Sequence, residues 1–374
     1  MDNAVIVGAG VFGASLAWWL AREGVAVTLV DRLEPGDPRA TSGGESRLIR
    51  CGHGPDATYT ASARRARTLW RELESECGDE LMVECGLVWM AHAEDGFEAA
   101  SAATMAALDI PCERLDPGAG ARLFPSFDPS GLAFLLHEPE AGVLRAQRAT
   151  QALARRAAAH GATVVRAEAA QDGDRVRLAN GRTLEADVVV WACGAWLGEL
   201  FPHHTEIRST RQELFFFAGG PAWAAPGVPA YVDFDRAIYG TGDLDELGVK
   251  AAPDFDGPPL APGAELPPAT AGSERLARAF LRDRFPALSD APLAGSKCCR
   301  YELSPDAHFV AAPLPEHPSV WLLGGGSGHG FKHGPALAEA VAAALRGAAP
   351  LPPQYGIGPR HGARGLLRTA GATG

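Results

Sequence analysis

The chain opens with a short apolar run that breaks into glycines and continues with helically spaced apolar residues. Ala4–Val7 is apolar without alternation, which predicts a buried parallel strand. Apolar residues then recur at helical spacing over Ala14–Glu23, which predicts a helix. A second apolar run, Val25–Val30, predicts another strand and is followed by Asp31. Strand, helix and strand together indicate a βαβ unit at the start of the chain.

The rest of the chain alternates between similar α/β segments and segments with the pattern of antiparallel strands. Helices are expected at Asp56–Cys77, Gln147–His160 and Pro335–Leu345. Strands are expected at Leu81–Ala91, Thr163–Ala167, Asp187–Ala192, Glu206–Phe217, Val228–Tyr239 and Ser319–Leu323, with a hairpin turn at Asn180-Gly181. The region 253–268 is rich in proline and glycine and predicts a long surface loop.

The order of these segments predicts the fold class. The α/β segments fall at the start, middle and end of the chain, and the antiparallel segments fall between them. We therefore expect an α/β protein with a Rossmann-like nucleotide-binding domain and a substrate domain built on a mixed or antiparallel β-sheet with helices. The first domain is assigned residues 1–80, 140–205 and 295–374, and the second is assigned residues 81–139 and 206–294.

Composition narrows the possible partners and the compartment. The 374-residue chain has a formal net charge of −11, which disfavours nucleic acid and discourages self-association, so we expect a monomer or a weak homo-oligomer. No apolar run approaches the length of a membrane span, and no signal-peptide pattern precedes the first strand. The seven cysteines lack metal-ligand spacing, so we expect no metal and a cytoplasmic location with reduced thiols.

The glycines after the first strand fit the pattern of a dinucleotide-binding turn. Gly8, Gly10 and Gly13 follow G-x-G-x-x-G, where they permit a tight turn, close approach of a pyrophosphate and close helix packing. The positive end of the following helix favours the pyrophosphate. Asp31 ends the second strand, where an acid can accept a hydrogen bond from a ribose hydroxyl. A dinucleotide is therefore expected, but this turn leaves NAD and FAD both open.

Four stretches resemble a known family across nearly the whole chain. They are VGAGVFG at 7–13, ESRLIR at 45–50, CCRYELSPDAHFV at 298–310 and GGGSGHGFKHG at 324–334. They are similar to the monomeric sarcosine oxidase and N-methyltryptophan oxidase family, within the D-amino-acid-oxidase-like flavoproteins. This resemblance implies covalent FAD and two-electron oxidation of an amine that carries a carboxylate. Dioxygen would reoxidise the flavin and yield hydrogen peroxide.

The resemblance also implies which residues hold the cofactor. It places FAD against Gly8, Gly10, Val11, Phe12, Gly13, Asp31, Arg32, Ser42, Arg47, Gly194, Trp196, Cys299, Gly326, Gly328, Gly330, Phe331 and Lys332. The second glycine-rich turn would direct a helix N-terminus at the flavin, where its positive end stabilises the anionic reduced form.

The adjacent Cys298 and Cys299 lie in a predicted strand, so their side chains point to opposite faces and only one can reach a flavin. The family pattern of a cysteine two positions before an aromatic matches Cys299 and Tyr301. By resemblance, Cys299 attaches the flavin and Cys298 belongs to the core. From the residues alone, two buried thiols without chemistry would be the simpler interpretation.

The resemblance assigns substrate-site functions as well. Arg50 and Lys332 would bind the substrate carboxylate, for which a guanidinium fork and an ammonium are suitable donors. His329 would lie beside the substrate, and Tyr239 would line the pocket. Lys250 would activate dioxygen, because a cation beside the flavin stabilises the superoxide formed on the first electron transfer.

The chain departs from the family near the substrate. His53 occupies the position of an aromatic, Gly43 replaces a larger residue, and Asp254 lies where sarcosine oxidases carry a histidine nearby. We therefore expect a side chain larger or more polar than that of sarcosine, with space opened by Gly43 and a hydrogen bond from His53. Three alternatives remain open: a flavin dehydrogenase with another electron acceptor, a non-catalytic flavin-binding subunit, and an NAD-dependent enzyme.

Overall fold

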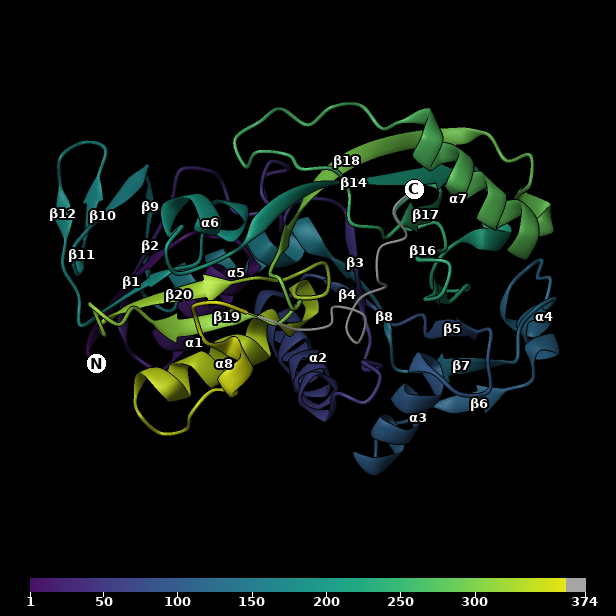
Figure 1. Ribbon diagram of the computed structural model, residues 1–374, viewed down its shortest axis with the longest axis horizontal. Helices are drawn as coiled ribbons and strands as arrows, with labels where there is room; N and C mark the ends of the chain where they lie inside the picture. The colour runs from purple at the N-terminus through teal and green to yellow at the C-terminus, as the bar shows by residue number, and fades with distance from the viewer. Residues whose placement is uncertain (361–374) are drawn as a thin grey trace.

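The computed structural model of the protein describes residues 1–360, and residues 361–374, which end the predicted nucleotide-binding segment, lie outside the described residues. Within residues 1–360, six strands form one sheet that is parallel except for its edge strand β19. In spatial order they are β19 (Val310–Pro313), β20 (Val320–Gly324), β13 (Val188–Trp191), β1 (Asn3–Val7), β2 (Ala26–Asp31) and β9 (Thr163–Arg166). Figure 1 shows this sheet at the left, beside the N-terminus.

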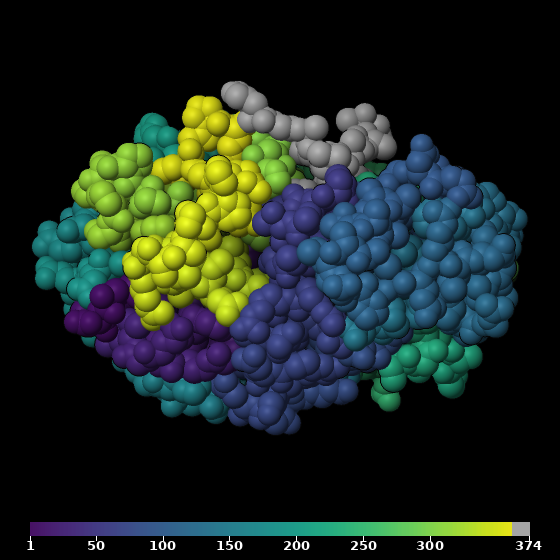
Figure 2. All heavy atoms as spheres, turned by 90° about the horizontal axis from the view of Figure 1, so that it is seen from below, coloured from purple at the N-terminus to yellow at the C-terminus, as the bar shows by residue number. Residues whose placement is uncertain are grey.

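Helices from distant parts of the chain pack on this sheet or on one another beside it. They are α1 (Val11–Arg22), α2 (Ala57–Cys77), α5 (Ala146–Ala159) and α8 (Gly334–Leu345). Helix α1 packs between α5 and α8, and its residues from Val11 to Ala21 are all buried. Figure 2 shows the N-terminal segment in purple beside the C-terminal segment in yellow, in agreement with the packing of α1 against α8. The first and last parts of the chain therefore share one hydrophobic core.

Eight other strands of the described chain form a second sheet. In spatial order they are β18 (Leu293–Leu303), β14 (Arg208–Phe217), β17 (Val249–Pro253), β16 (Ile238–Thr241), β15 (Ala230–Asp233), β5 (Leu87–Ala91), β7 (Phe134–Glu138) and β6 (Glu113–Leu115). The pairs are antiparallel except for β5 and β15. Helix α7 (Ala271–Arg284) packs on β14 and β17, and α3 (Phe97–Ala107) packs on β5 and β7.

Two small sheets and two short helices complete the named elements. One sheet contains β3 (Ser46–Ile49), β8 (Gly142–Arg145) and β4 (Met82–Val83), and the other contains β10 (Ala169–Asp172), β11 (Arg175–Leu178) and β12 (Thr183–Leu184). The short helices are α4 (Gly120–Leu123) and α6 (Leu197–Leu200). The turn at Asn180-Gly181 joins β11 to β12 as a hairpin, as predicted. Strand β3 was not predicted, although it carries Arg47.

This arrangement confirms the predicted α/β fold class, with mixed sheets and helices. The domain boundaries stay a prediction. One element bears on them: β18, which they assign mostly to the nucleotide-binding domain, pairs along its length with β14 of the eight-stranded sheet. None of the helices in the described part of the chain combines the length and hydropathy needed to span a bilayer.

Several predicted elements begin or end elsewhere for local reasons. Helix α1 begins at Val11 and not at Ala14, so that it includes Gly13. The predicted strand over 81–91 divides into β4 and β5, because Gly86 between them turns with a φ of 77°. The predicted strand over 228–239 is a hairpin of β15 and β16. Helices α3 and α7 were missed, because each buries only a narrow stripe of residues.

Candidate cofactor and substrate site

The glycine turn between β1 and α1 allows three segments to meet closely. Gly8 has a φ of 109°, and a Cβ there would lie 2.3 Å from the carbonyl oxygen of Ala192. A Cβ on Gly13 would lie 1.9 Å from the carbonyl oxygen of Gly8. Any side chain at either position would force the turn apart. The N-terminal end of α1 therefore opens directly beside the end of β13.

A cavity of about 170 Å³ adjoins this turn. Most of the predicted cofactor-binding residues line it: Gly8, Gly10, Val11, Phe12, Asp31, Arg32, Ser42, Arg47, Gly194, Trp196, Gly326, Gly328, Gly330 and Phe331. Gly13, Cys299 and Lys332, which were also predicted, are not in its wall. Gly13 packs behind the turn, Lys332 lines a neighbouring cavity, and Cys299 lies on β18.

One end of this large cavity is lined by an acid, a guanidinium and an aromatic ring. The Asp31 carboxylate accepts from the backbone N–H of Ala9 at 2.6 Å and of Leu33 at 2.8 Å, and burial raises its pKa. The Arg32 guanidinium lies 4.7 Å from the centre of the Trp196 ring. Ser42 Oγ accepts from the backbone N–H of Val11 at 2.8 Å.

A second cavity of about 70 Å³ adjoins the first. The two share Arg47, Tyr301, Gly328 and Phe331 as wall residues. The smaller cavity is also lined by Arg50, Tyr239, His329 and Lys332, all predicted for the substrate site, and by Asp254. A group bound in the large cavity would therefore lie next to the smaller one at the shared wall.

Arg50 is held by backbone and aromatic contacts. Its guanidinium donates to the carbonyl of Gly52 and lies 4.6 Å from the Trp89 ring centre. Burial lowers the pKa of Arg50 to about 10, and the nearby Glu138 carboxylate opposes that shift. Arg50 therefore keeps its positive charge at neutral pH.

Glu138 was missed by sequence reasoning. Its carboxylate accepts from the backbone N–H groups of Cys51 and Gly52 and from Trp89 Nε1, at 2.6, 3.1 and 2.7 Å. It therefore fixes the turn that follows Arg50. No sequence signal marked it, because a single acid that ends a strand is common at surfaces.

Lys332 lies across the smaller cavity. Its Nζ donates to the carbonyl of His329 at 2.8 Å, and its own carbonyl accepts from Trp70 Nε1 at 2.8 Å. Burial, followed by the charge of Arg50, lowers the pKa of Lys332 well below its usual range. An anion between Arg50 and Lys332 would favour the protonated lysine.

Lys250 and Cys299 lie together near the shared wall. Lys250 Nζ is 3.3 Å from Ser46 Oγ and 5.0 Å from the Tyr239 ring centre. Burial and then Arg47 lower the pKa of Lys250 to about 8. Burial raises the pKa of Cys299, whereas the charges of Arg47 and Lys250 lower it. Burial is the larger effect, so the pKa of the Cys299 thiol stays above its usual value despite the two nearby cations.

Cys298 differs from its prediction. Its side chain is half-buried, belongs to none of the hydrophobic clusters of the described residues, and lies near Glu213 and Arg211. Strand alternation correctly separates it from Cys299. The face to which it points is polar, however, because the strand β14 pairs Cys298 with Glu213.

Two further expectations near the substrate are wrong. His53 is fully buried and is not in the wall of the smaller cavity. Gly43 opens no space, because a Cβ there would lie 2.4 Å from the carbonyl oxygen of Asp37. The carbonyl of Gly43 instead accepts from Arg47 at 2.7 Å. Neither residue supports the expected larger side chain of the substrate.

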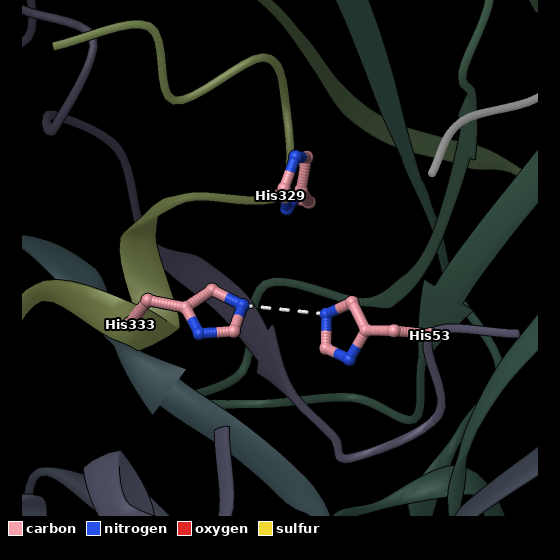
Figure 3. Close-up of side chains that lie close together, drawn as sticks. All are labelled: His53, His329 and His333. Carbon is pink, nitrogen blue, oxygen red and sulfur yellow. Dashed lines mark hydrogen bonds between the residues drawn. The ribbon is translucent and has the colours of Figure 1, made fainter. Parts of the chain in front are cut away.

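His53 belongs to a buried cluster with His329 and His333 (Figure 3). His53 Nδ1 must donate to the Cys51 carbonyl, at 2.9 Å, so its Nε2 accepts. His333 Nε2 then donates to His53 Nε2 at 3.3 Å, and His333 Nδ1 accepts from the hydroxyl of Ser62 at 3.0 Å. The result is a directed hydrogen-bonded chain of neutral imidazoles.

The same cluster has the donor set of a three-histidine metal site, with one ring nitrogen of each residue within 4.8 Å of the others. The nearby Arg50 opposes a dication. The Arg50 charge lowers the pKa of both His53 and His333, and by the same repulsion it would raise the energy of a bound dication. We therefore interpret the cluster as a hydrogen-bonded chain. Sequence reasoning missed it, because His53 and His333 are far apart in the chain.

Comparison with known proteins identifies the family. The family described as FAD dependent oxidoreductase matches residues 3–344. The chain belongs to this family. The chain is 28% identical over 364 residues to monomeric sarcosine oxidase of Bacillus sp. (strain NS-129), covering 91% of this chain and 92% of the relative. It is 27% identical over 352 residues to N-methyl-L-tryptophan oxidase of Yersinia pestis (strain Pestoides F), covering 91% and 94%.

Solved structures of similar fold agree with this family. L-proline dehydrogenase from P. horikoshii superposes with a TM-score of 0.83 at 20% identity, covering 95% of this chain and 96% of that chain. Iminodiacetate oxidase from Chelativorans sp. BNC1 superposes with a TM-score of 0.78 at 20% identity, covering 94% and 97%. At this level of identity the likeness concerns the fold.

Because of the histidine chain, we expect the folded protein to lose stability in mild acid. Burial lowers the pKa of both His53 and His333 well below the usual range, so below about pH 6.5 the unfolded chain binds protons that the folded oxidoreductase cannot. The free energy of unfolding should fall by up to about 1.4 kcal/mol per pH unit for each histidine. Denaturant unfolding between pH 7 and 5 measures this slope.

The double variant His53→Phe/His333→Phe should lose much of that slope, because phenylalanine takes up no proton. His203→Gln serves as the control, since His203 is exposed. An unchanged slope in the double variant would mean that other groups cause the acid sensitivity.

Proposed function

We propose that this FAD-dependent oxidoreductase oxidises a C–N bond of an amino acid, or of an N-methyl or cyclic imino acid, to an imine. FAD would be attached covalently through Cys299, and dioxygen would take up the electrons as hydrogen peroxide. The oxidases among its relatives, named for sarcosine and N-methyl-L-tryptophan, support the substrate class. Seven free thiols support the expected cytoplasmic location, and the oligomeric state stays a prediction.

One observation supports this proposal most strongly. The large cavity, with its glycine turn and helix end, shares four wall residues with a smaller cavity that contains a guanidinium and a lysine, Arg50 and Lys332. FAD held in the large cavity would therefore adjoin the cavity that contains these two cations. An amine held there by its carboxylate would lie close to the cofactor, and such proximity is what amino-acid oxidation requires.

The residues of the large cavity fit FAD. The N-terminus of α1 offers backbone N–H groups and a positive dipole end to a pyrophosphate. Asp31 offers a carboxylate to a ribose, and the Arg47 and Phe331 side chains lie at the wall shared with the smaller cavity. When bound, FAD supplies a reversible two-electron acceptor.

The protein itself contributes binding, charge and exclusion of water. Arg50 and Lys332 would orient the substrate carboxylate, and the walls of the smaller cavity would contact the remainder of the substrate. Burial in this cavity favours the neutral amine, which carries the electron pair needed for oxidation. Tyr239, Phe234 and Val232 give one wall an apolar and aromatic surface that suits a hydrocarbon side chain.

The choice between oxidase and dehydrogenase depends on Lys250. A buried cation beside Cys299 and Arg47 supports dioxygen as the electron acceptor, because it stabilises superoxide. A peroxide-coupled screen of N-methylated, cyclic and ordinary amino acids, run beside an artificial electron acceptor, tests the proposal. Turnover with the artificial acceptor alone would indicate a dehydrogenase, and turnover with neither would indicate a flavin-binding subunit.

The first prediction concerns the flavin link. Protein precipitated with acid should stay yellow, and Cys299→Ala should release its flavin on precipitation, because a covalent bond survives unfolding. Cys298→Ala is the matched control, since Cys298 faces the other side of the same strand. Yellow precipitate from Cys299→Ala, or colourless precipitate from the native protein, would exclude Cys299 as the attachment site.

The second prediction concerns dioxygen. A unit charge at about 4 Å and an effective dielectric near 20 contributes about 4 kcal/mol, or roughly three decades of rate. Lys250→Met should therefore slow flavin reoxidation by about two to three decades, with much less effect on reduction by substrate. Stopped-flow measurement of the two half-reactions checks this, with Lys297→Met on the exposed end of β18 as control.

The native enzyme should also show a pH dependence that the Lys250→Met variant lacks. The ammonium form of Lys250 is present below its pKa of about 8, so reoxidation should slow as the pH rises through that value. A reoxidation rate that falls equally in both proteins would assign the titration to another group.

The third prediction concerns the carboxylate. Charge-assisted hydrogen bonds contribute roughly 1.5–3 kcal/mol each, so Arg50→Ala or Lys332→Ala should weaken binding of a carboxylate inhibitor by about 10- to 150-fold. Both variants should keep their flavin, because the two changed residues are not in the wall of the large cavity. Titration of the flavin absorbance with inhibitor measures the affinity. A preference of the native enzyme for amines without a carboxylate would contradict the clamp.

A further inference from the structure

Glu302 places a buried carboxylate in the wall of the large cavity, near the end of β18. Only 6% of the surface of Glu302 is exposed. Oε1 accepts from the backbone N–H of Gly326 at 2.9 Å. Among the described residues, Oε2 has no hydrogen-bond partner. A buried carboxylate oxygen without a donor is unfavourable, so the protein by itself leaves this group incomplete.

The unpartnered oxygen faces a glycine, which leaves space beside it because it has no side chain. A Cβ on Gly194 would lie 2.9 Å from Glu302 Oε2 and 3.0 Å from Thr41 Oγ1. Gly194 therefore leaves room between two polar oxygens that both belong to cavity-lining residues. Burial raises the pKa of Glu302 to about 7, which agrees with a carboxyl group that lacks donors.

The position of Glu302 along the cavity restricts its partner. Its bonded neighbour Gly326 lies near Phe12 of the α1 N-terminus, with 3.7 Å between a Cβ placed on Gly326 and the Phe12 ring. Tyr301, the residue before Glu302, belongs to the wall shared with the smaller cavity. Glu302 therefore lies between the end of the cavity that suits a pyrophosphate and the end that suits a flavin ring.

We infer that Glu302 Oε2 accepts a hydrogen bond from a hydroxyl of the ribityl chain, the part of FAD that joins the pyrophosphate to the ring. This inference rests on the proposed binding of FAD in the large cavity. A carboxylate accepts from hydroxyl groups and repels phosphate, which selects the ribityl chain among the parts of FAD expected there. Glu302 is then a cofactor-binding residue that the glycine motifs do not reveal.

The experiment uses the Cys299→Ala protein, in which FAD can dissociate and be titrated back. Glu302→Gln and Glu302→Ala are added to this background, and FAD affinity is measured by the change in flavin fluorescence. Loss of a charge-assisted hydrogen bond should weaken FAD binding by about 10- to 100-fold in Glu302→Ala. Glu302→Gln, which keeps the size but not the charge, should give a smaller loss.

Glu98 provides a matched control. It is 4% exposed, burial raises its pKa to about 7, and its Oε1 has no hydrogen-bond partner among the described residues. It lies on α3 and not in the wall of the large cavity. Glu98→Gln should therefore leave FAD affinity unchanged.

Two fragments of FAD locate the contact. FMN carries the ribityl chain but no adenosine, and ADP carries the pyrophosphate and adenosine but no ribityl chain. The Glu302 variants should bind FMN more weakly than their parent does, but should bind ADP with unchanged affinity. An equal loss of ADP affinity would overturn the inference, because it would mean that Glu302 only shapes the cavity.

A stability measurement tests the assignment by a readout other than flavin fluorescence. Without FAD at pH 8, Glu302→Gln should melt at the same temperature as its parent or higher, because it removes an incomplete buried charge. With saturating FAD its gain in melting temperature should be smaller than the parent's. An unchanged FAD affinity in both Glu302 variants overturns the inference alone, whereas failure of the Cys299→Ala parent to bind FAD at all overturns the proposed function.

Discussion

The antiparallel ladder between β14 and β18 is the contact on which the whole site depends. It pairs Arg208 with Leu303 at one end and Phe217 with Leu293 at the other, so it fixes a long strand of the eight-stranded sheet in one register. The same strand reaches the nucleotide cavity, where Arg300, Tyr301 and Glu302 join the wall. A shift of one residue would exchange the faces of Cys298 and Cys299 and would move the Cys299 thiol away from Arg47 and Lys250.

Buried cations dominate the electrostatics around this strand. Lys250 and Lys332 are buried and Arg50 is half-buried, and this loss of contact with water lowers the pKa of all three. Such charges are costly unless they are paired, and the protein pairs them only in part. Glu138 lies near Arg50, and Lys332 donates to a carbonyl. The remaining positive potential is what the proposed anionic substrate would meet in the smaller cavity.

The histidine chain shows how the same potential acts on its neighbours. The charges of Lys332 and Arg50 add to burial in keeping His53 and His333 neutral. The Cys51 carbonyl can only accept a hydrogen bond, so it fixes the tautomer of His53. That tautomer in turn fixes the direction of the hydrogen bonds between the neutral imidazoles. The packing behind His329 is therefore ordered by hydrogen bonds and not by hydrophobic contact alone.

The sequence by itself determined the βαβ unit and the positions of many strands and helices, because glycine spacing and apolar periodicity are local properties. The family motifs indicated many of the residues that line the two cavities. The sequence could not determine that Gly43 packs against Asp37, that His53 meets His333, that Glu138 holds the turn after Arg50, or that Glu302 bonds to Gly326 in the cavity wall. These contacts join residues far apart in the chain, and a polar residue shows no periodic signal when its partner comes from another segment. Only the tertiary structure, which brings β18, the glycine turns and the segment after β3 together, decided which charges face the cavities and which stay behind them.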